Sequence, residues 1–299
     1  MKKYLILGLL GIILIVSAEI VLAAKPNFQV AKVINPITEE TKNTVKIPAK
    51  AIQVAPNIFY LGVIMEKEKV IEGYAFIDYK AGFGKPSKCN NDGVCQKWED
   101  SSCADCQGGG GNSDCYGFLA NGTKWKTSEP YIVNASNTQG LSDSFVRTNL
   151  VSDIAKWENA AGTDILGEET SGIVDGADTV SPDGKNEVYF GDIDQPGAIA
   201  ITIVWGVFSG PPKQRKLIEW DQVYDEVDFN WSSDCQSENC DTKMDFENIA
   251  THELGHAVGL NDLYEGKCSE QTMYGWADYG EIIKRTLEIG DITGIQNLY

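Results

Sequence analysis

The chain is poor in histidine and in positive charge. It has 299 residues but only two histidines, and its 25 lysines and arginines are outnumbered by 43 aspartates and glutamates, which gives a net charge of −18. Binding to a nucleic-acid backbone depends on clustered lysine and arginine, so this balance argues against a nucleic-acid partner. Long hydrophobic runs are also missing after residue 24, so no later segment reaches a transmembrane length.

The first residues have the three parts of a secretory signal. Lys2 and Lys3 precede an apolar run over 4–16, and small residues follow up to Ala23 and Ala24. This plan predicts a signal peptide over 1–24; an uncleaved anchor is the alternative, because the run is nearly long enough to span a bilayer. The even number of cysteines, eight, agrees with an oxidising compartment. We expect a secreted or cell-envelope protein, with membrane contact only through an uncleaved N-terminal segment.

Both histidines fall in one short stretch, HELGHAVGLND, which runs from residue 252 to residue 262. On a helix, residues four apart share a face, so His252 and His256 can bind one metal ion. Glu253 is placed to hold a water bound to that ion and to act as its general base. Gly259 can end the helix and turn the backbone, which brings Asp262 back toward the ion. The alternative is an ordinary buried helix. Such a helix would not require the combination of two histidines, a glutamate, a glycine and an aspartate at these five positions.

The scarcity of histidine also restricts the third ligand. With both imidazoles used, the remaining protein ligand must be Asp, Glu or Cys, and Asp262 has the right spacing. The sequence therefore predicts one catalytic zinc held by His252, His256 and Asp262.

The motif H-E-x-x-H-x-x-G-x-x-D, with a methionine after it, resembles the metzincin metallopeptidases. Thr272-Met273-Tyr274-Gly275 is similar to the Met-turn of their matrixin branch, and residues 290–299 are similar to the end of matrixin catalytic domains, where an aspartate, here Asp291, caps the last helix. The resemblance covers about 114–299 and is strong after residue 245. It implies a zinc endopeptidase with Glu253 as the catalytic residue and Met273 as an apolar floor beneath the ligands.

Two departures from the family limit this resemblance. Typical animal matrixins have histidine where Asp262 stands, and they carry a structural zinc bound by three histidines and an aspartate. Ile201 stands where one of those histidines is expected. This chain therefore cannot build the structural zinc site, and we expect calcium, apolar packing or disulfides to brace the fold instead.

The part before the motif divides into four segments by composition. Residues 25–85 carry β-rich runs at 51–54, 58–64 and 74–79, and about sixty residues bury only a marginal core, so this region should lean on its neighbour as a propeptide or accessory module. Residues 86–107 form a Cys-rich module, and the Gly-rich run 108–113 is a linker and a natural place for activating cleavage. Residues 114–299 make the catalytic domain.

In the Cys-rich module, Cys89, Cys95, Cys103 and Cys106 are interleaved with carboxylates. Two disulfides, with calcium on the acidic residues, are favoured over a zinc site of four thiolates, because thiolate zinc sites are less expected outside the cell. A plug of the catalytic zinc by Cys89 is not favoured, since the residues around it lack the matrixin Arg-Cys-Gly pattern. The acidic residues expected to bind calcium in this module are Asp92, Glu99, Asp100 and Asp105.

For residues 114–299 the pattern predicts an α+β domain with a twisted mixed sheet, an active-site helix, a Met-turn and a C-terminal helix. A helix should begin at Ser142 or Asp143 and end at Gly162. Strands should follow around 187–190, 197–207 and 217–224, and Asp245 should cap the zinc helix. A loop rich in aspartate is either a calcium site or a set of solvated turns; its aspartates are Asp175, Asp178, Asp183, Asp192 and Asp194. Four cysteines should form two bridges, with Cys235–Cys240 closing a small loop; the four are Cys115, Cys235, Cys240 and Cys268.

An extended polypeptide substrate should add to the edge of the strand 197–203, whose backbone groups we expect to be unpaired. Residues 275–280 should wall the adjacent pocket. The candidate substrate-binding residues are Gly197, Ala198, Ile199, Ala200, Tyr274 and Trp276. The sequence thus predicts a secreted, monomeric zinc endopeptidase; the alternative is a surface- or matrix-binding protein in which proteolysis is minor.

Overall fold

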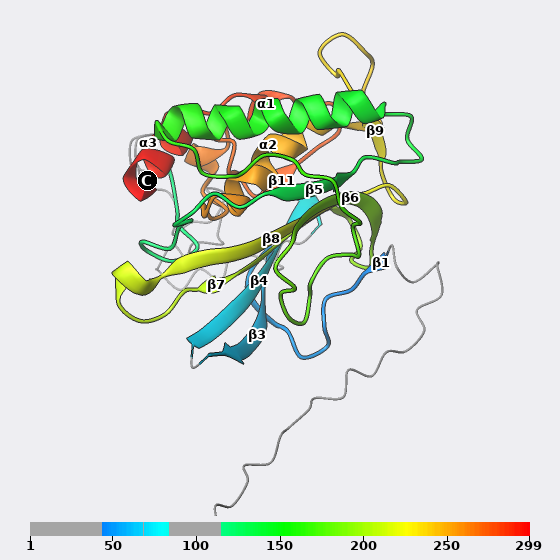
Figure 1. Ribbon diagram of the computed structural model, residues 1–299. Coiled ribbons are helices and arrows are strands. Elements are labelled where there is room, and N and C mark those ends of the chain that lie inside the picture. The colour runs from blue at the N-terminus through cyan, green and yellow to red at the C-terminus, as the bar shows by residue number, and fades with distance from the viewer. Residues whose placement is uncertain (1–43, 68, 84–114) are drawn as a thin grey trace, which may run out of the picture. The chain divides into compact units, whose positions relative to one another are not determined.

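The computed structural model describes residues 44–67, 69–83 and 115–299 (Figure 1). The signal peptide or anchor, the Cys-rich module with Cys89 and the linker 108–113 lie outside these residues, and they remain predictions. Among the described residues, no helix has the length and apolar character needed to cross a membrane.

A mixed nine-stranded sheet forms the centre of the fold. Its order is β1-β6-β8-β7-β4-β3-β2, with β5 beside β6 and β11 beside β4. β5, β6 and β8 run parallel, whereas β7, β4, β3 and β2 each run antiparallel to the preceding neighbour in that order. The bounds are β1 Thr44–Val45, β2 Ile52–Ala55, β3 Ile58–Glu66, β4 Lys69–Lys80, β5 Tyr131–Asn134, β6 Asn186–Ile193, β7 Ala198–Val207, β8 Lys216–Asp225 and β11 Trp276–Ala277; β9 (Asn230–Ser232) and β10 (Lys243–Asp245) pair separately.

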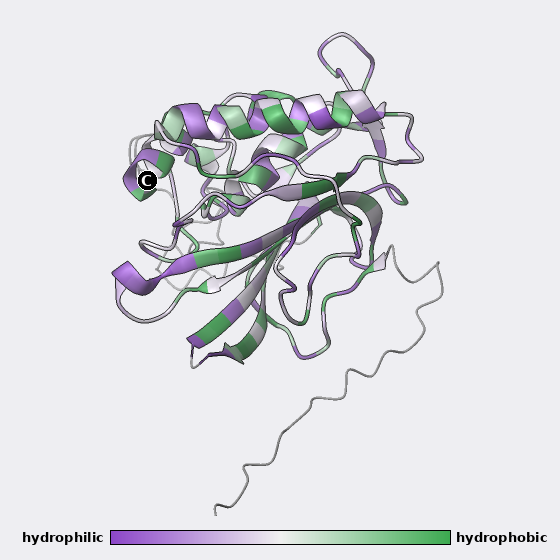
Figure 2. Cartoon of the chain, viewed as in Figure 1, coloured by the Kyte–Doolittle hydropathy of each residue, from purple (hydrophilic) through white to green (hydrophobic). Residues whose placement is uncertain are grey.

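The first long helix, α1 (Asp143–Ala161), begins and ends where the sequence predicts. The Ser142 hydroxyl accepts a hydrogen bond from the backbone N–H of Phe145 at 3.2 Å, and Gly162 adopts a left-handed conformation with φ of 72°. The helix alternates hydrophobic and hydrophilic residues (Figure 2), so it can pack one side and expose the other. Its buried side includes Val146, Leu150, Ile154 and Trp157.

The second helix, α2 (Phe246–Ala257), carries the HELGH motif. Asp245 caps it by accepting the backbone N–H of Asn248 at 3.0 Å, as predicted, and Gly259 turns the chain after it with φ of 107°. The Trp157 indole of α1 donates a hydrogen bond to the carbonyl of Thr251 at 2.9 Å, which ties the two helices together. The last helix, α3 (Ile289–Leu298), closes the chain (Figure 1).

Two hydrophobic clusters fill the two faces of the sheet. The helical face holds Trp157, Phe190, Tyr224 and Phe246 together with the apolar residues of α2. The opposite face is built by residues such as Ile77, Ile201 and Trp205, against which residues of the loop before β6, including Val174 and Ala177, pack. Ile201, in place of a structural zinc ligand, is fully buried, so apolar packing braces this part of the fold.

The two predicted bridges among the later cysteines are present. Cys115 joins Cys268, and Cys235 joins Cys240 to close a small loop before α2. The first bridge links residues 153 positions apart, and it fixes the start of the 115–299 region to the loop that precedes Met273.

The prediction of a free edge on the strand 197–203 is wrong. Residues 72–79 of β4 pair antiparallel with residues 198–206 of β7, and Asp78 lies opposite Ala200. β4 comes from the β-rich region before residue 85, so that region does not form a sheet of its own (Figure 1). The physical reason is that so short a segment buries little core alone, while β7 offers unpaired backbone groups along its edge.

Candidate metal centre

The side chains of His252, His256 and Asp262 converge at the end of α2. The Asp262 Oδ1 atom lies 3.4 Å from the Nε2 atom of each histidine. All three side chains are buried, and His252 Nε2 and Asp262 Oδ1 make no hydrogen bond within the described part of the chain. Buried polar atoms without a partner are costly, so their convergence needs a compensating partner.

The spacing of Asp262 Oδ1 from each histidine Nε2 fits a zinc ion. Ligand atoms at tetrahedral positions about 2.0–2.1 Å from zinc lie about 3.3 Å from one another. The observed separations of 3.4 Å match that edge length closely. Two imidazoles and one carboxylate are also a donor set that zinc accepts.

The second nitrogen of each ring is already engaged by the backbone. His252 Nδ1 lies 2.6 Å from the carbonyl oxygen of Thr272, and His256 Nδ1 lies 3.0 Å from that of Leu260. A carbonyl only accepts, so each Nδ1 carries the proton and each Nε2 keeps its lone pair for a metal. The sequence predicted the imidazoles, but not the backbone groups that orient them.

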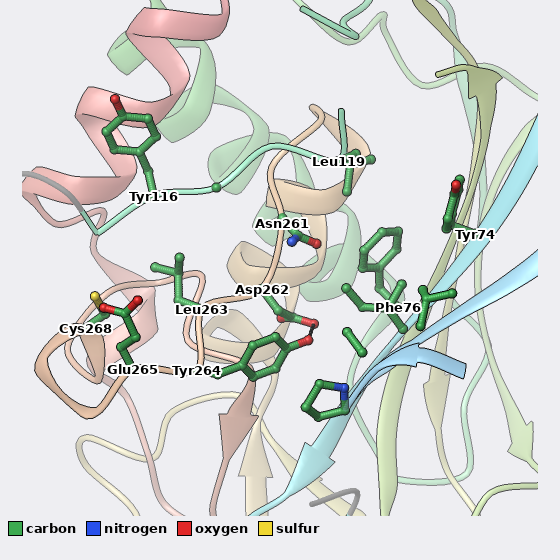
Figure 3. A pocket seen from close by; sticks show the side chains of 15 residues that line it. Tyr74, Phe76, Tyr116, Leu119, Asn261, Asp262, Leu263, Tyr264, Glu265 and Cys268 are labelled. Atoms are coloured by element: carbon green, nitrogen blue, oxygen red, sulfur yellow. Dashed lines mark hydrogen bonds between the residues drawn. The ribbon is translucent and has the colours of Figure 1, made fainter. Parts of the chain in front are cut away.

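Asp262 is held as a carboxylate. Burial acts to raise its pKa, but His256 and His252 outweigh burial and keep the pKa well below its usual range. The Tyr264 hydroxyl donates to the other oxygen, Oδ2, at 3.3 Å (Figure 3). Asp262 therefore offers Oδ1 as a charged donor and uses Oδ2 to fix its orientation.

Glu253 lies on the sheet side of α2. The Thr202 hydroxyl of β7 donates to Glu253 Oε2, while Oε1 has no hydrogen-bond partner among the described residues. Burial raises the pKa of Glu253 to about 8, and His256 and Thr202 oppose that rise. A carboxyl group with a raised pKa beside a metal site suits proton transfer near neutral pH.

Met273 lies beneath the histidine-bearing helix. It is 2% exposed, and its sulfur occupies the space that a side chain at Gly255 would need. The backbone around it is held by Asp291 of α3, whose carboxylate accepts the N–H groups of Thr272 at 2.8 Å and of Met273 at 3.2 Å. The N-cap of α3 is Glu288, and Asp291 at the third helical position completes a capping box by accepting the backbone N–H of Glu288 at 2.9 Å. Asp291 therefore supports the helix start, as the sequence predicted, and also fixes the turn.

The proposed substrate-contact residues lie beside β4. Residues 198–200 form the start of β7 and pair with it, and Trp276 of β11 pairs in parallel with Tyr79. Tyr274 and Trp276 pack ring to ring at 5.5 Å, and Trp276 is buried. Gly197 adopts a left-handed conformation with φ of 81° just before β7.

Sequence reasoning missed three groups near the site. Asp78 of β4 is buried beside His252 and Glu253, Lys284 lies 3.6 Å from Asp78, and the Phe76 ring stacks on His256 with ring centres 4.4 Å apart. The sequence did carry a signal for Asp78, which is a lone charge in the run Ala75-Phe76-Ile77-Asp78-Tyr79. Charged residues are seldom buried without a partner, so a charge inside an apolar strand indicates a partner nearby.

A cavity of about 440 Å³ opens beside Asp262 (Figure 3). Tyr74 and Phe76 of β4 line one side, and Tyr116 and Leu263 line the opposite side. The cavity therefore lies between the β-rich region before residue 85 and the rest of the described chain.

The aspartate-rich loop divides into separate groups. Lys185 pairs with Asp175 and Asp183 at 2.7 and 2.6 Å, while Asp192 and Asp194 contact β1 and the residue after it, through Thr44 and Lys46. Only Asp178 of the five joins a buried acidic cluster, in which its carboxylate lies within 4.8 Å of those of Glu219 and Asp221. Glu219 is fully buried, and its Oε1 atom has no hydrogen-bond partner among the described residues.

Comparison with known proteins agrees with this geometry. Residues 204–299 match the family model of the matrixins, Peptidase_M10. The match begins within β7 and takes in β8, the HELGH helix, Met273 and α3. No curated protein matches the chain. The match, together with the two convergent histidines above a buried methionine turn, supports a matrixin-like metzincin domain in this part of the chain.

Proposed function

We propose that the chain is an exported zinc-dependent endopeptidase that hydrolyses peptide bonds of polypeptide substrates. The observation that carries this proposal is the pair of 3.4 Å separations between Asp262 Oδ1 and the two histidine Nε2 atoms. The two disulfides and the expected signal peptide support export.

His252, His256 and Asp262 would hold the zinc. When bound, zinc supplies a Lewis acid that polarises the scissile carbonyl and lowers the pKa of a water. Glu253 Oε1 is the acceptor for the proton of the attacking water, because Thr202 already occupies Oε2. The same oxygen then delivers the proton to the nitrogen of the departing amine. Met273 and Asp291 keep in place the turn whose Thr272 carbonyl orients His252.

A structural calcium ion is also proposed for the cluster of Asp178, Glu219 and Asp221. Calcium takes several carboxylate and carbonyl oxygens, and the buried, unpartnered Glu219 Oε1 supplies a donor that no other described group satisfies.

A comparison of the wild type with Glu253→Ala in the full chain tests the peptidase proposal. Both proteins should bind one zinc per chain, because Glu253 is not a ligand. After proteolytic processing, only the wild type should cut a pool of quenched peptides, since loss of a general base lowers the rate by about 10²–10⁴-fold. His252→Ala should lose the zinc. Equal hydrolysis by wild type and Glu253→Ala would contradict the proposal, as would a wild type that takes up no zinc.

A further inference from the structure

A buried lysine lies near the candidate metal centre. The Lys284 side chain is fully buried, and its ammonium makes no hydrogen bond among the described residues. Its one ion pair within the same residues is with Asp78 of β4, whose Oδ2 atom lies 3.6 Å from Nζ, beyond hydrogen-bond distance. Removing an ammonium from water is costly unless other groups replace the water, so ordinary core packing does not explain a lysine at this position.

Two elements of the metal centre fix the backbone of this lysine. Lys284 belongs to the short 3₁₀ helix η6 (Ile283–Arg285). Its backbone N–H donates to Asn248 Oδ1 of α2 at 2.8 Å, and its carbonyl accepts from the Thr272 hydroxyl at 3.4 Å. Asn248 lies about one helical turn before His252, and the Thr272 carbonyl orients that histidine. The lysine is therefore held by the same two elements that carry and orient a proposed zinc ligand.

The segment expected to wall the substrate pocket leads into η6. It follows the methionine turn over residues 275–280, and its Trp276 is buried and pairs with the end of β4. Just after the segment, Glu281 accepts a hydrogen bond from Asn248 Nδ2 of α2 at 3.3 Å. Residues 275–280 and α2, the two sides of the predicted pocket, are thus joined close to Lys284.

Asp78 marks the place where a bound side chain would meet this lysine. β4 pairs antiparallel with β7, and Asp78 lies opposite Ala200. A peptide that adds a strand to β7 would use the same backbone groups, so a side chain in this register takes the place of Asp78. One Asp78 oxygen lies within 4.8 Å of a ring nitrogen of His252 and of a carboxylate oxygen of Glu253. That side chain would thus lie close both to the proposed general base and to the Lys284 ammonium.

The direction of β4 shows on which side of the cut this side chain would lie. Phe76 stacks on His256 with ring centres 4.4 Å apart. Asp78 comes two residues later on the same face of the strand, close to His252 and Glu253. A peptide paired antiparallel with β7 runs in the same direction as β4, so it passes His256 before it reaches the position of Asp78. The side chain at that position would therefore follow the scissile bond.

A buried ammonium at this place selects the charge of its partner. An acidic side chain would pair with Lys284, whereas an apolar side chain would leave the ammonium buried alone and a basic one would add repulsion. Glu281 is another acid close to the lysine; burial raises its pKa, and the lysine charge opposes that rise. Among the described residues, however, Glu281 makes no ion pair with Lys284, so it does not replace Asp78 as the partner.

We propose that Lys284 is a specificity-determining residue of the peptidase, and that the site bounded by α2 and residues 275–280 takes an acidic side chain, aspartate or glutamate, from the residue that follows the scissile bond. This inference rests on the proposed function and deepens it, because it names the substrate class: polypeptides with an acid directly after the cut. Lys284 contacts the substrate side chain and takes no part in proton transfer, which stays with Glu253.

Matched peptides test this preference in the full chain after proteolytic processing. Quenched peptides that differ only in glutamate against glutamine, or aspartate against asparagine, separate charge from shape, and mass spectrometry identifies the bond that is cut. The test variant is Asp78→Asn/Lys284→Met, which removes both buried charges so that neither is left alone while the chain folds. Lys243→Met is the control, because that side chain is 40% exposed and pairs with Glu238 at 3.5 Å.

The wild type should cleave the acidic peptides, directly before the acid, with a kcat/KM about 10- to 100-fold higher than that for their amide partners, the range that one charged hydrogen bond provides. The double variant should lose this ratio through a fall on the acidic peptides, and Lys243→Met should keep it. The wild-type ratio tests the inference even if the variant does not fold. Equal cleavage of both peptides by the wild type would overturn the inference, as would an acid required only before the cut or a ratio that survives in the double variant.

The two proposals fail in different ways in this experiment. If the wild type cuts no peptide, or if Glu253→Ala cuts as fast as the wild type does, the peptidase proposal is wrong and the inference falls with it. If hydrolysis depends on Glu253 but glutamate and glutamine peptides are cut equally, the peptidase proposal stands and the role of Lys284 falls.

Discussion

The carboxylate of Asp291, at the start of α3, accepts hydrogen bonds from the backbone N–H groups of Thr272 and Met273, at 2.8 and 3.2 Å. The same carboxylate accepts the N–H of Glu288 at 2.9 Å. The carbonyl of Thr272 in turn accepts from His252 Nδ1. One acidic residue therefore connects the last helix, the methionine turn and the proposed metal ligand His252.

Asp291→Asn should weaken both the fold and the metal site. The amide turns an N–H₂ group toward backbone donors, and each buried donor left unsatisfied costs about 1–3 kcal/mol. We expect a lower free energy of unfolding in urea and a weaker zinc affinity. Glu288→Ala is the control, because it disturbs only the helix start, and it should lower stability without changing zinc affinity. An unchanged zinc affinity in Asp291→Asn would show that the turn does not position His252.

Thr202→Val should slow catalysis in the processed protein. Valine keeps the shape of threonine but cannot donate to Glu253 Oε2, so Glu253 loses the bond that orients it. One charge-assisted bond of about 1.5 kcal/mol corresponds to a fall of roughly tenfold in kcat, with little change in KM. Thr202→Ser restores the hydroxyl and should recover most of the rate. A fall confined to KM would instead indicate a role in substrate binding.

The acidic cluster should make the stability of the calcium-free protein depend on pH. Burial raises the pKa of Asp178 to about 6 and that of Glu219 to about 8, and burial likewise holds the pKa of Asp221 well above its usual range. Groups with raised folded-state pKa values contribute stability that is present below their unfolded pKa, near 4, and is lost as pH rises through the folded values. In a chelator, the melting temperature should therefore fall between about pH 5 and pH 8.

Calcium should reverse this loss. At about 100 times its Kd, a ligand stabilises the folded state by about 2.7 kcal/mol, which raises the melting temperature of a chain of this size by about 5–10 °C. Glu219→Gln should reduce both the pH dependence and the response to calcium, whereas Asp194→Asn, on an exposed carboxylate paired with Lys46, should change neither. A calcium response that survives in Glu219→Gln would place the ion elsewhere.

Cleavage at the Gly108–Gly111 run should activate the protein. With a recognition site for a sequence-specific protease inserted there, the cut chain should hydrolyse quenched peptides at least about tenfold faster than the uncut chain, because β4 can then leave β7. Size-exclusion chromatography should show the N-terminal piece separating as activity rises. The same insertion in Glu253→Ala should separate without activity. Full activity in the uncut chain would mean that β4 does not block the edge.

The sequence predicts well what local rules govern. Ser142, Gly162, Asp245 and Gly259 were predictable because caps and left-handed turns are decided by neighbouring residues. The spacing of the metal site was predictable for the same reason: His252 and His256 lie one helical turn apart, and Asp262 follows the glycine turn directly.

The pairing of β4 with β7 was not predictable, since the two strands are far apart in the chain and many edges were open to β4 in principle. Asp78 and Lys284 meet only because of that pairing, so neither could be placed beside the candidate metal centre from its own surroundings. The surroundings of the aspartate-rich loop were not predictable for a related reason: Glu219 and Asp221, the partners of Asp178, lie on β8.

Zinc K-edge X-ray absorption of the full chain, loaded with one equivalent of zinc, tests whether the two histidines bind the ion. We expect only nitrogen and oxygen ligands at about 2.0–2.1 Å, with outer-shell scattering from two imidazoles, and loss of that pattern in His252→Ala. Sulfur ligands at about 2.3 Å would place the zinc among the cysteines of the 86–107 module and contradict it. A spectrum with fewer than two imidazoles would do the same.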